Sequence, residues 1–384
     1  MLRILFIILT VAHALIHLFG FIKAFELAEL SQLTKQISKP IGVFWLLSFL
    51  LFLSVILLFS MKWDGWWKVA IIAIVLSEFV IINSWTNAKW GTVINLIILI
   101  PTIAAIFESL PSSLSRIYES NVEVRLKAQT EHTVLTPEHL AHLPAPVQKY
   151  LVYTQSVGKP IIKNFQLNFD GQFKQKVASN WLKIKSSQHN FYDSPARYFL
   201  MKSNLYGIPF QGLHIYEKDE ASMVIKLASI LKVVDSKSDF MHQSETVTFF
   251  NDICIYAPTS LVDKSIKWKL VDSLTVEAIY ANAGSVISAK LYFNEIGELV
   301  NFESADRYLS EDGIKHELHK WSTPISDYKE YRGRKIPFSG NAIWHLPDGE
   351  FYYAKFKLEE IKYNNEKTTP NISSCCATLS FSRK

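Results

Sequence analysis

Four long apolar segments dominate the first third of the chain, at positions 4–22, 41–61, 67–85 and 91–107. Each has 17 to 21 residues, and a helix of that length, rising about 1.5 Å per residue, spans or nearly spans a hydrocarbon core about 30 Å thick. Trp63, Trp67 and Trp90 lie at segment ends, which is typical of a membrane–water interface. The short connections favour antiparallel packing, so we expect a four-helix transmembrane bundle over residues 1–107.

The pattern changes near residue 161, where apolar and polar residues begin to alternate as they do in strands with one buried face. Phe165, Leu167 and Phe169 show this alternation, and Asp-Gly pairs supply turns between such segments. Residues 240–255 interrupt it with helical spacing. We therefore expect an α+β membrane protein, in which the bundle precedes a curved, half-barrel-like antiparallel sheet of about ten to twelve strands with a few helices.

The domain boundaries follow from these patterns. Residues 108–134 are polar and mixed in charge, which is typical of a linker. A short helix is predicted to begin at Thr136, with Pro137 at its first position. We expect the soluble β domain to occupy residues 135–364 and the polar residues 365–384 to form a disordered tail.

The distribution of charged residues supports the division into a membrane part and a soluble part, and it argues against one class of function. Residues 1–107 hold 11 charged side chains, the remaining 277 residues hold 64, and the formal net charge is only +5. A charge this small and dispersed does not suit nucleic-acid binding. Basic residues at the segment ends favour the side of the N-terminus by six to four, so we expect a multi-pass protein of the inner (plasma) membrane whose soluble domain is cytoplasmic. The bilayer is the expected partner, and the oligomeric state is not predicted.

Polar side chains inside the apolar segments form the first candidate site. His13 and His17 are four residues apart and share one face of the first predicted helix, while Glu78 and Asn95 lie at comparable depth in the third and fourth. Because ionisable groups are costly in hydrocarbon unless they are paired, we expect these four side chains to face inward and meet, with Glu78 facing the first helix. Such a cluster either relays protons or holds a ligand, or it only joins the helices.

The soluble part carries no recognisable catalytic motif. It has no glycine-rich phosphate loop, no Gly-x-Ser-x-Gly elbow and no His-Glu-x-x-His sequence. His316 and His319 would point to opposite faces of a strand, and three cysteines, two of them adjacent, cannot build a disulfide framework or a cysteine-based zinc site. We therefore predict no metal and no cofactor, and enzymatic activity is the less favoured alternative.

Aromatic and charged residues of the C-terminal half form the second candidate site. Arginine stacks on aromatic rings and binds carboxylate or phosphate through two parallel bonds, so Arg307 and Arg334 suit an anionic amphiphile. If Asp306 and Asp327 pair with these arginines instead, the residues are only structural. The candidate ligand pocket comprises Trp268, Asp306, Arg307, Trp321, Asp327, Tyr328, Arg334 and Trp344.

The soluble part contains, in order, the motifs LPAPVQKYL (143–151), FDGQF (169–173), DRY (306–308), DY (327–328) and GRKIP (333–337), with tryptophans between them. In this order they resemble an uncharacterised bacterial family, a domain of unknown function, over about residues 136–364. The resemblance implies an architecture and no chemistry. The preceding helices resemble, more loosely, the small four-helix membrane proteins of the DoxX type.

Three functions are compatible with these features. The favoured one is a membrane-tethered module that binds a lipid or another amphiphile on the aromatic concave face of the curved sheet. The second is a small transporter or redox membrane subunit that uses His13, His17 and Glu78. The third is an enzyme whose pocket in the β domain is built from aspartates and arginines.

Overall fold

The computed structural model describes residues 2–30, 34–127, 133–205, 208–310 and 315–364. Two compact units make up the chain. The first contains Met1–Glu119 together with Asn204–Gln211 and Ile225–Val233, and the second contains Ser120–Ser203, Gly212–Val224 and Val234–Lys384. The predicted disordered tail, residues 365–384, lies outside the described residues.

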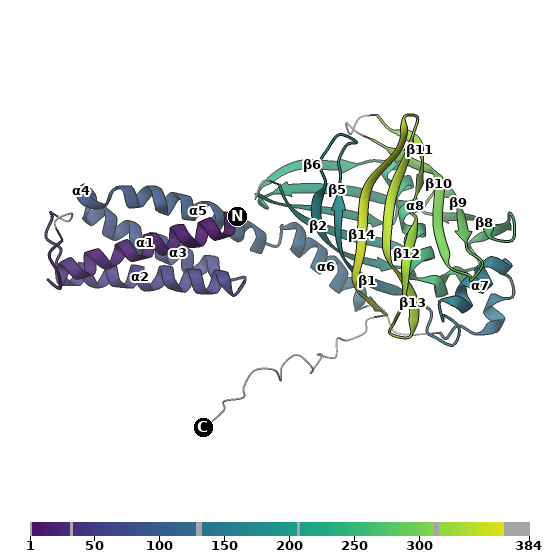
Figure 1. Ribbon diagram of the computed structural model, residues 1–384, viewed down its shortest axis with the longest axis horizontal. Coiled ribbons are helices and arrows are strands. Elements are labelled where there is room, and N and C mark those ends of the chain that lie inside the picture. Colours follow the sequence, from purple (N-terminus) through teal and green to yellow (C-terminus); the bar gives the residue numbers. More distant parts are fainter. Residues whose placement is uncertain (1, 31–33, 128–132, 206–207, 311–314, 365–384) are drawn as a thin grey trace, which may run out of the picture. The chain divides into compact units, whose positions relative to one another are not determined.

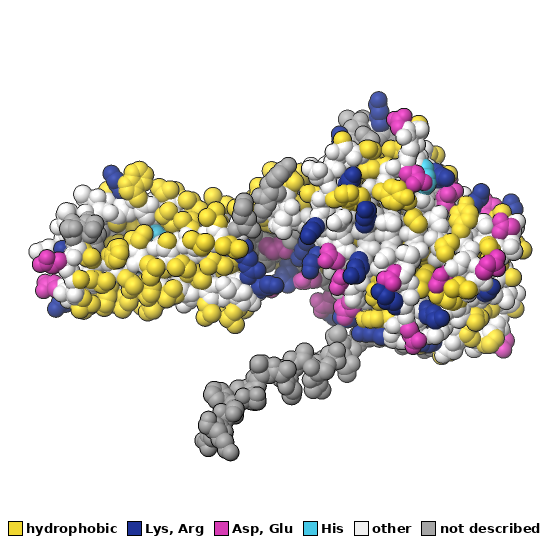
Figure 2. All heavy atoms as spheres, viewed as in Figure 1, with side chains coloured by type: hydrophobic (Ala, Val, Ile, Leu, Met, Phe, Trp, Pro, Cys, Tyr) yellow, Lys and Arg dark blue, Asp and Glu magenta, His cyan; other side chains and the backbone are white. Residues whose placement is uncertain are grey.

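The first unit is built on four long helices and one short helix: α1 (Leu2–Ala24), α2 (Lys39–Ser60), α3 (Trp66–Asn83), α4 (Trp85–Ala88) and α5 (Trp90–Ser109). Helix α2 packs against α1 and α3, and α5 packs against the same two helices, so the four long helices form a closed ring. The predicted apolar helices are thus confirmed, and within the part of the chain that the structure describes four helices are long and apolar enough to cross a membrane. Figure 2 shows hydrophobic side chains over most of the visible face of this helical region.

Small residues allow the helices to approach closely. A Cβ atom at Gly20 of α1 would lie 2.1 Å from the ring of Trp45 on α2, so only glycine fits there. Phe52, Val55 and Ile98 fill the centre of the ring and are fully buried. The helices are therefore in close contact at Gly20, and the centre of the ring is filled by buried apolar side chains.

The predicted linker, residues 108–134, contains a helix, α6 (Leu114–Leu126). Leu114, Tyr118 and Val122 recur at a spacing of four and form its one buried stripe. At the end of this helix Arg125 donates hydrogen bonds to Tyr198 Oη at 2.9 Å and to Glu217 Oε1 at 2.6 Å. The end of α6 is thereby attached to strands of the sheet.

The described residues form one antiparallel sheet of fourteen strands, more than the sequence suggested. Strands β1 to β6 follow one another in a meander, β14 pairs with β1, and β13, β11, β10, β9, β8 and β7 continue from β14, while β12 pairs with β13. The edge strands are therefore β6 and β7. The strands are β1 (Asn164–Phe173), β2 (Leu182–Phe191), β3 (Ala196–Leu205), β4 (Ile208–Glu217), β5 (Glu220–Leu227), β6 (Leu231–Lys237), β7 (Lys267–Leu270), β8 (Thr275–Asn282), β9 (Ser285–Phe293), β10 (Leu299–Leu309), β11 (Glu317–Ser322), β12 (Ile325–Tyr331), β13 (Arg334–Leu346) and β14 (Gly349–Tyr363).

The helices of the β domain are η1 (Pro137–Leu140), α7 (Ala145–Tyr153), α8 (Asp239–Tyr256) and η2 (Pro258–Val262). Helix α8 confirms the helical spacing of residues 240–255 and connects the two edge strands, so the chain crosses the inside of the curved sheet (Figure 1). Ser238 caps the helix, because its side chain accepts a hydrogen bond from the backbone N–H of Met241.

Helix α8 fills the centre of the concave face. Phe250 stacks on Tyr280 of β8 with ring centroids 4.9 Å apart, and it contacts Phe302 of β10 edge to face. Nearly every residue of the helix is buried, which explains why its sequence shows little amphipathic character. The aromatic concave face that the sequence offered as a binding surface is therefore largely covered by this helix.

Candidate functional site

A cluster of buried charges joins α8 to the sheet. Arg197 of β3 donates from Nε to Asp252 Oδ2 at 2.9 Å and from Nη1 to Glu245 Oε2 at 3.1 Å, and both carboxylates lie on α8. His214 of β4 places its Nδ1 3.1 Å from Glu245 Oε2. Removing one partner of a buried ion pair leaves the other charge uncompensated. The cluster therefore fixes α8 to the inside of the sheet.

The pKa values of the two carboxylates in this cluster shift in opposite directions. Burial raises the pKa of Asp252, and Arg197 offsets this only in part, although Gln188 and Asn190 also donate hydrogen bonds to its Oδ2. Burial acts in the same direction on Glu245, but there the neighbouring His214 and Arg197 outweigh it and hold the pKa well below its usual range. Glu245 is thus the fixed negative charge of the cluster.

Arg307 of β10 approaches the other carboxylate oxygen of Glu245. Its Nη2 lies 3.6 Å from Glu245 Oε1, and its Nη1 donates to the hydroxyl of Tyr353 at 2.9 Å. The guanidinium also lies over two rings, 4.5 Å from the centroid of Trp321 and 5.0 Å from that of Trp344. Its Nε is buried and has no hydrogen-bond partner among the described residues. One donor of this arginine is therefore buried without an acceptor among the described residues.

Half-buried rings continue from Arg307 along the inner face of the sheet, and we call Phe173, Phe199, Tyr353 and Phe356 the aromatic strip. Phe173 contacts Tyr353, and Phe199 contacts Phe356, in both pairs edge to face. Arg197 lies over Phe199 at 4.9 Å, so this strip shares the face on which α8 packs. A guanidinium with a free donor beside partly exposed rings suits a molecule with an anionic head and an apolar tail.

The structure brings three of the eight predicted pocket residues together, namely Arg307, Trp321 and Trp344. The two aspartates lie elsewhere. Asp306 accepts hydrogen bonds from the backbone N–H and the hydroxyl of Ser288, at 2.6 and 2.9 Å. Asp327 pairs with Lys329 at the surface. The pocket of aspartates and arginines that an enzyme would need is therefore not assembled around Arg307.

Within the described structure, the remaining predicted pocket residues contact other parts of the β domain and not Arg307. Arg334 donates to the carbonyl oxygen of Pro160 and lies over the ring of Tyr363. Tyr328 donates to the carbonyl oxygen of Leu299, and Trp268 lies on the edge strand β7. These hydrogen bonds join β13 to the segment before β1 and β12 to the start of β10.

Sequence reasoning missed Arg197, Glu245, Asp252 and Tyr353, although one signal was present. Glu245 and Asp252 are seven residues apart, which places both on one face of a helix whose neighbouring residues are largely apolar. Two acidic side chains on such a face require buried partners. The identity of those partners depends on which strands the helix crosses, and this information is not local in the sequence.

The predicted polar cluster of the helical region forms, with one addition. His13 Nε2 lies 3.0 Å from Asn95 Oδ1, and His17 Nε2 lies 2.9 Å from the hydroxyl of Ser77, a residue that sequence reasoning missed. Asn95 Nδ2 donates to Glu78 Oε2 at 2.9 Å. Glu78 therefore faces α5 rather than α1, because Asn95 offers it a closer donor, and it reaches the histidines only through Asn95.

A groove of about 390 Å³ lies beside this cluster, between α1, α2, α3, α5 and the short α4. His13 and His17 contribute to its wall, and Ile16, Gly91 and Ile94 are among its apolar lining residues. Within the described part of the chain, no group of three or more histidine, cysteine, aspartate or glutamate side chains has the arrangement of a metal site. The groove suits an uncharged or apolar molecule better than a cation.

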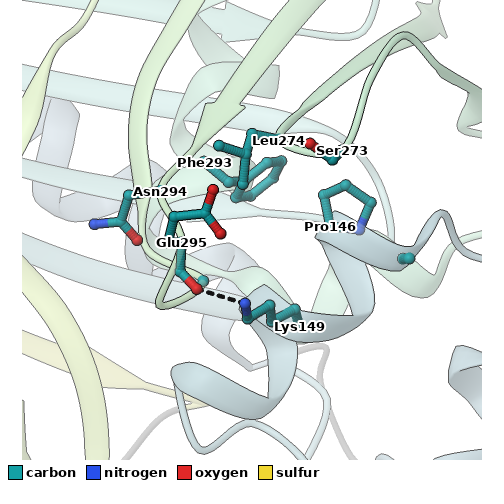
Figure 3. Close-up of a pocket in the computed structure, with 9 residues that line it drawn as sticks. Pro146, Lys149, Ser273, Leu274, Phe293, Asn294 and Glu295 are labelled. Carbon is teal, nitrogen blue, oxygen red and sulfur yellow. Dashed lines mark hydrogen bonds between the residues drawn. The ribbon is translucent and has the colours of Figure 1, made fainter.

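The first motif of the soluble part builds a small pocket of about 130 Å³ where α7 meets the β9–β10 turn (Figure 3). Lys149 of this motif donates to the carbonyl oxygen of Glu295 at 2.5 Å. Gly297 has a φ of +95°, and a Cβ atom there would lie 3.0 Å from Lys149 Cγ. The motif residues therefore hold α7 against a glycine-containing turn, which is an architectural role.

The family of unknown function DUF6544 matches residues 133–356, more than half of the chain. The chain belongs to this family. The resemblance to an uncharacterised family is thereby confirmed. The pocket around Lys149 and the cluster around Arg307 both lie within the matched residues. A comparison with curated proteins finds no significant match.

Several solved structures are distantly similar to the chain. A domain from Vibrio parahaemolyticus, described as an outer membrane lipoprotein-sorting protein, is 11% identical, with 54% of this chain and 87% of that chain covered and a TM-score of 0.34. A DUF1329 family protein from Desulfovibrio piger is 11% identical, with 58% and 94% covered and a TM-score of 0.34. A LolA superfamily protein from Nitrosomonas europaea is 10% identical, with 56% and 93% covered and a TM-score of 0.30. Similarity this distant does not indicate a function.

Proposed function

We propose that this DUF6544 protein is a multi-pass protein of the inner (plasma) membrane whose cytoplasmic β domain binds an anionic amphiphile. Four helices of sufficient length and hydropathy support the membrane assignment. Their outward residues, such as Leu57, Ile72, Ile82 and Ile100, are exposed and apolar, which is costly in water and favourable in lipid.

The observation that carries the amphiphile proposal is the surroundings of Arg307. Its buried Nε has no partner among the described residues, and the half-buried aromatic strip begins at Tyr353, to which its Nη1 donates. A phosphate or carboxylate group at Nε completes the hydrogen bonding of the guanidinium, while an acyl chain covers the rings of the strip. The rings of the strip are already partly exposed, so an acyl chain can contact them at the surface.

A photo-crosslinking experiment on the full-length protein tests this proposal. The protein is placed in nanodiscs containing phosphatidylglycerol with a diazirine in its acyl chain, irradiated and digested, and the adducts are mapped by mass spectrometry. We expect adducts on the peptides of the aromatic strip. Loss of a hydrogen bond to a charged group costs about 1.5–3 kcal/mol, so Arg307→Ala should reduce these adducts about tenfold or more.

Arg334→Ala is the matched control, because Arg334 also lies over an aromatic ring, that of Tyr363, which is not part of the strip. It should leave the adducts unchanged. A neutral phosphatidylcholine probe should label the strip more weakly than phosphatidylglycerol, since it carries no net negative charge. Adducts confined to the helical region, or equal labelling by both probes, would show that Arg307 does not hold an anionic amphiphile.

A second candidate function rests on the groove beside His13 and His17, which we propose holds the head group of a membrane-soluble molecule. The amide of Asn95 separates Glu78 from the histidines and does not relay protons, so this arrangement favours binding over proton transfer. A Cβ atom at Gly91 would lie 2.7 Å from Ile81 Cδ1, so Gly91→Leu fills the groove. In the same irradiation experiment Gly91→Leu should suppress adducts near the groove, whereas Ala104→Leu on the same helix should not.

A further inference from the structure

Two hairpin ends of the sheet belong to the same compact unit as the apolar helices, the β3–β4 end at Asn204–Gln211 and the β5–β6 end at Ile225–Val233. The described parts of these ends carry a group of large apolar side chains, each between 36% and 60% exposed: Leu205, Ile208, Ile230, Leu231 and Val233. An apolar group of this size on a protein surface marks a contact with another apolar phase or partner.

Hydrogen bonds tie both hairpin ends to the point where α5 ends. Glu108, in the last turn of α5, accepts from Gln211 Nε2 at 2.8 Å with one carboxylate oxygen and from the hydroxyl of Ser229 at 2.7 Å with the other. Lys226 donates from Nζ to the carbonyl oxygen of Ser112 at 2.9 Å. The apolar side chains of the hairpin ends are therefore held beside the end of an apolar helix.

The strand that carries part of this group is also an edge of the sheet. Leu231 and Val233 of β6 are two residues apart and point to the same face, and both are exposed. An edge strand with exposed apolar side chains is a template for aggregation unless something covers it. Lys226 and Lys232 on the same hairpin place positive charge next to these side chains, which is complementary to anionic lipid head groups.

We propose that the described apolar side chains of the β3–β4 and β5–β6 hairpins, Leu205, Ile208, Ile230, Leu231 and Val233, insert into the head-group region of a bilayer that contains anionic lipid. The end of a membrane-spanning α5 lies at the membrane–water interface, and Glu108 and Ser112 hold the hairpin ends at that depth. Apolar side chains inserted about 5–10 Å into this region leave water without entering the hydrocarbon centre. This inference rests on the membrane integration proposed above and adds a second membrane contact that the helices do not provide.

Fluorescence quenching in the full-length protein tests the inference. In a background with Cys375→Ser and Cys376→Ser, where the remaining Cys254 is buried, Leu231→Cys is labelled with the environment-sensitive dye NBD. Single copies are placed in phosphatidylcholine–phosphatidylglycerol nanodiscs with nitroxides either near the lipid head group or deep in the acyl chain. Labels at Leu96, exposed on α5, and at Ile296, exposed in the β9–β10 turn, serve as references.

We expect the head-group nitroxide to quench the Leu231 label at least about threefold more than the Ile296 label, because only an inserted side chain comes within reach of the quencher. The Leu96 label reports on membrane integration by itself and should be quenched by the deep nitroxide. If Leu96 is quenched and Leu231 is quenched no more than Ile296, the hairpin inference is wrong and the membrane proposal stands. If Leu96 is not quenched, both are wrong. Protection of the Leu231 label from aqueous iodide without nitroxide quenching shows that a protein partner covers the hairpin, which also overturns the inference.

Discussion

Arg197 Nε and Asp252 Oδ2 lie 2.9 Å apart and join two elements that are 55 residues apart in the chain, strand β3 and helix α8. The same guanidinium donates to Glu245, about two turns earlier on the same face of the helix. A single side chain of the sheet therefore holds the helix at two points. Because α8 connects the edge strands β6 and β7, the position of this helix also determines how the two halves of the sheet relate to each other within the β domain.

We predict that Arg197→Met loosens α8 more than any surface change. It leaves the buried Asp252 without its main charged partner and removes one of the basic partners of Glu245, and breaking a buried pair in this way costs about 3–5 kcal/mol. Hydrogen exchange followed by mass spectrometry on the full-length protein should show the amides of α8 exchanging about 100-fold faster or more, while α1 to α5 are unchanged. Lys183→Met, an exposed position on the neighbouring strand β2, is the control. Equal exchange in both variants would mean that the apolar contacts of α8 alone hold it in place.

The stability of the β domain should fall in mild acid because of His189. Burial lowers the pKa of this imidazole to about 4, with a smaller contribution from Lys362, so between pH 6.5 and pH 4 the unfolded chain binds a proton that the folded chain does not. By linkage, the free energy of unfolding decreases as the pH falls through this window, by about 3 kcal/mol at most, and is unaffected above it.

The variant His189→Phe separates this contribution from other acid effects. His189 stacks on Phe191 and its Nδ1 has no partner in the described structure, so a second phenyl ring keeps the stacking and removes the titration. The thermal midpoint of His189→Phe should depend less on pH between 6.5 and 4 than that of the wild type, whereas His142→Gln, at an exposed position, should behave as the wild type does. A wild type and His189→Phe with identical pH profiles would contradict the prediction.

Local patterns in the sequence were sufficient for some features of the structure and not for others. The four apolar helices and the cluster of His13, His17 and Asn95 follow from residue periodicity and from the cost of polar groups among apolar ones, and both are properties of short segments. Most residues of strand β6 are exposed, so its sequence shows little alternation of apolar and polar residues. For this reason the number of strands was not predictable from that alternation. Helix α6 was missed because its buried stripe is only three residues long.

The candidate site depends on contacts that no segment of the sequence contains. Arg307 was identified because arginine among aromatic residues suggests an anion site, but its neighbours Glu245 and Tyr353 come from α8 and β14. Asp306, next to Arg307 in the chain, points to Ser288 instead, because neighbouring residues of a strand face opposite sides. Partners in such a sheet are decided by strand order, and strand order was not predictable from spacing.

Membrane topology provides the third prediction. Six basic residues against four predict that the N-terminus is on the cytoplasmic side, and four spans would return the chain to that side. In intact cells, Cys375 and Cys376 should therefore be protected from a membrane-impermeant maleimide and become labelled after the inner membrane is permeabilised. A cysteine introduced at Leu27, in the connection between α1 and α2, should show the reverse order. Rapid labelling of the two tail cysteines in intact cells would place the β domain on the outer side.

A substitution of Tyr353 distinguishes a structural role of Arg307 from a ligand-binding role. Its hydroxyl accepts hydrogen bonds from Arg307 Nη1 at 2.9 Å and from Trp321 Nε1 at 3.1 Å. Tyr353→Phe keeps the ring of the aromatic strip but leaves both donors unsatisfied, which should lower the stability of the β domain by about 1–3 kcal/mol. The same change frees Arg307 Nη1, which becomes a donor to an anionic acceptor in addition to Nε.

Tyr353→Phe should therefore lower the thermal midpoint and at the same time increase crosslinking of the phosphatidylglycerol probe to the aromatic strip. Arg307→Lys should reduce crosslinking despite keeping the charge, because lysine lacks the planar fork of donors. Tyr352→Phe, one residue away on the exposed side of β14, should change neither quantity. If stability and crosslinking fall together in Tyr353→Phe, the network of Arg307, Trp321 and Tyr353 serves the fold alone, since a site that binds an anion gains from the loss of a competing acceptor.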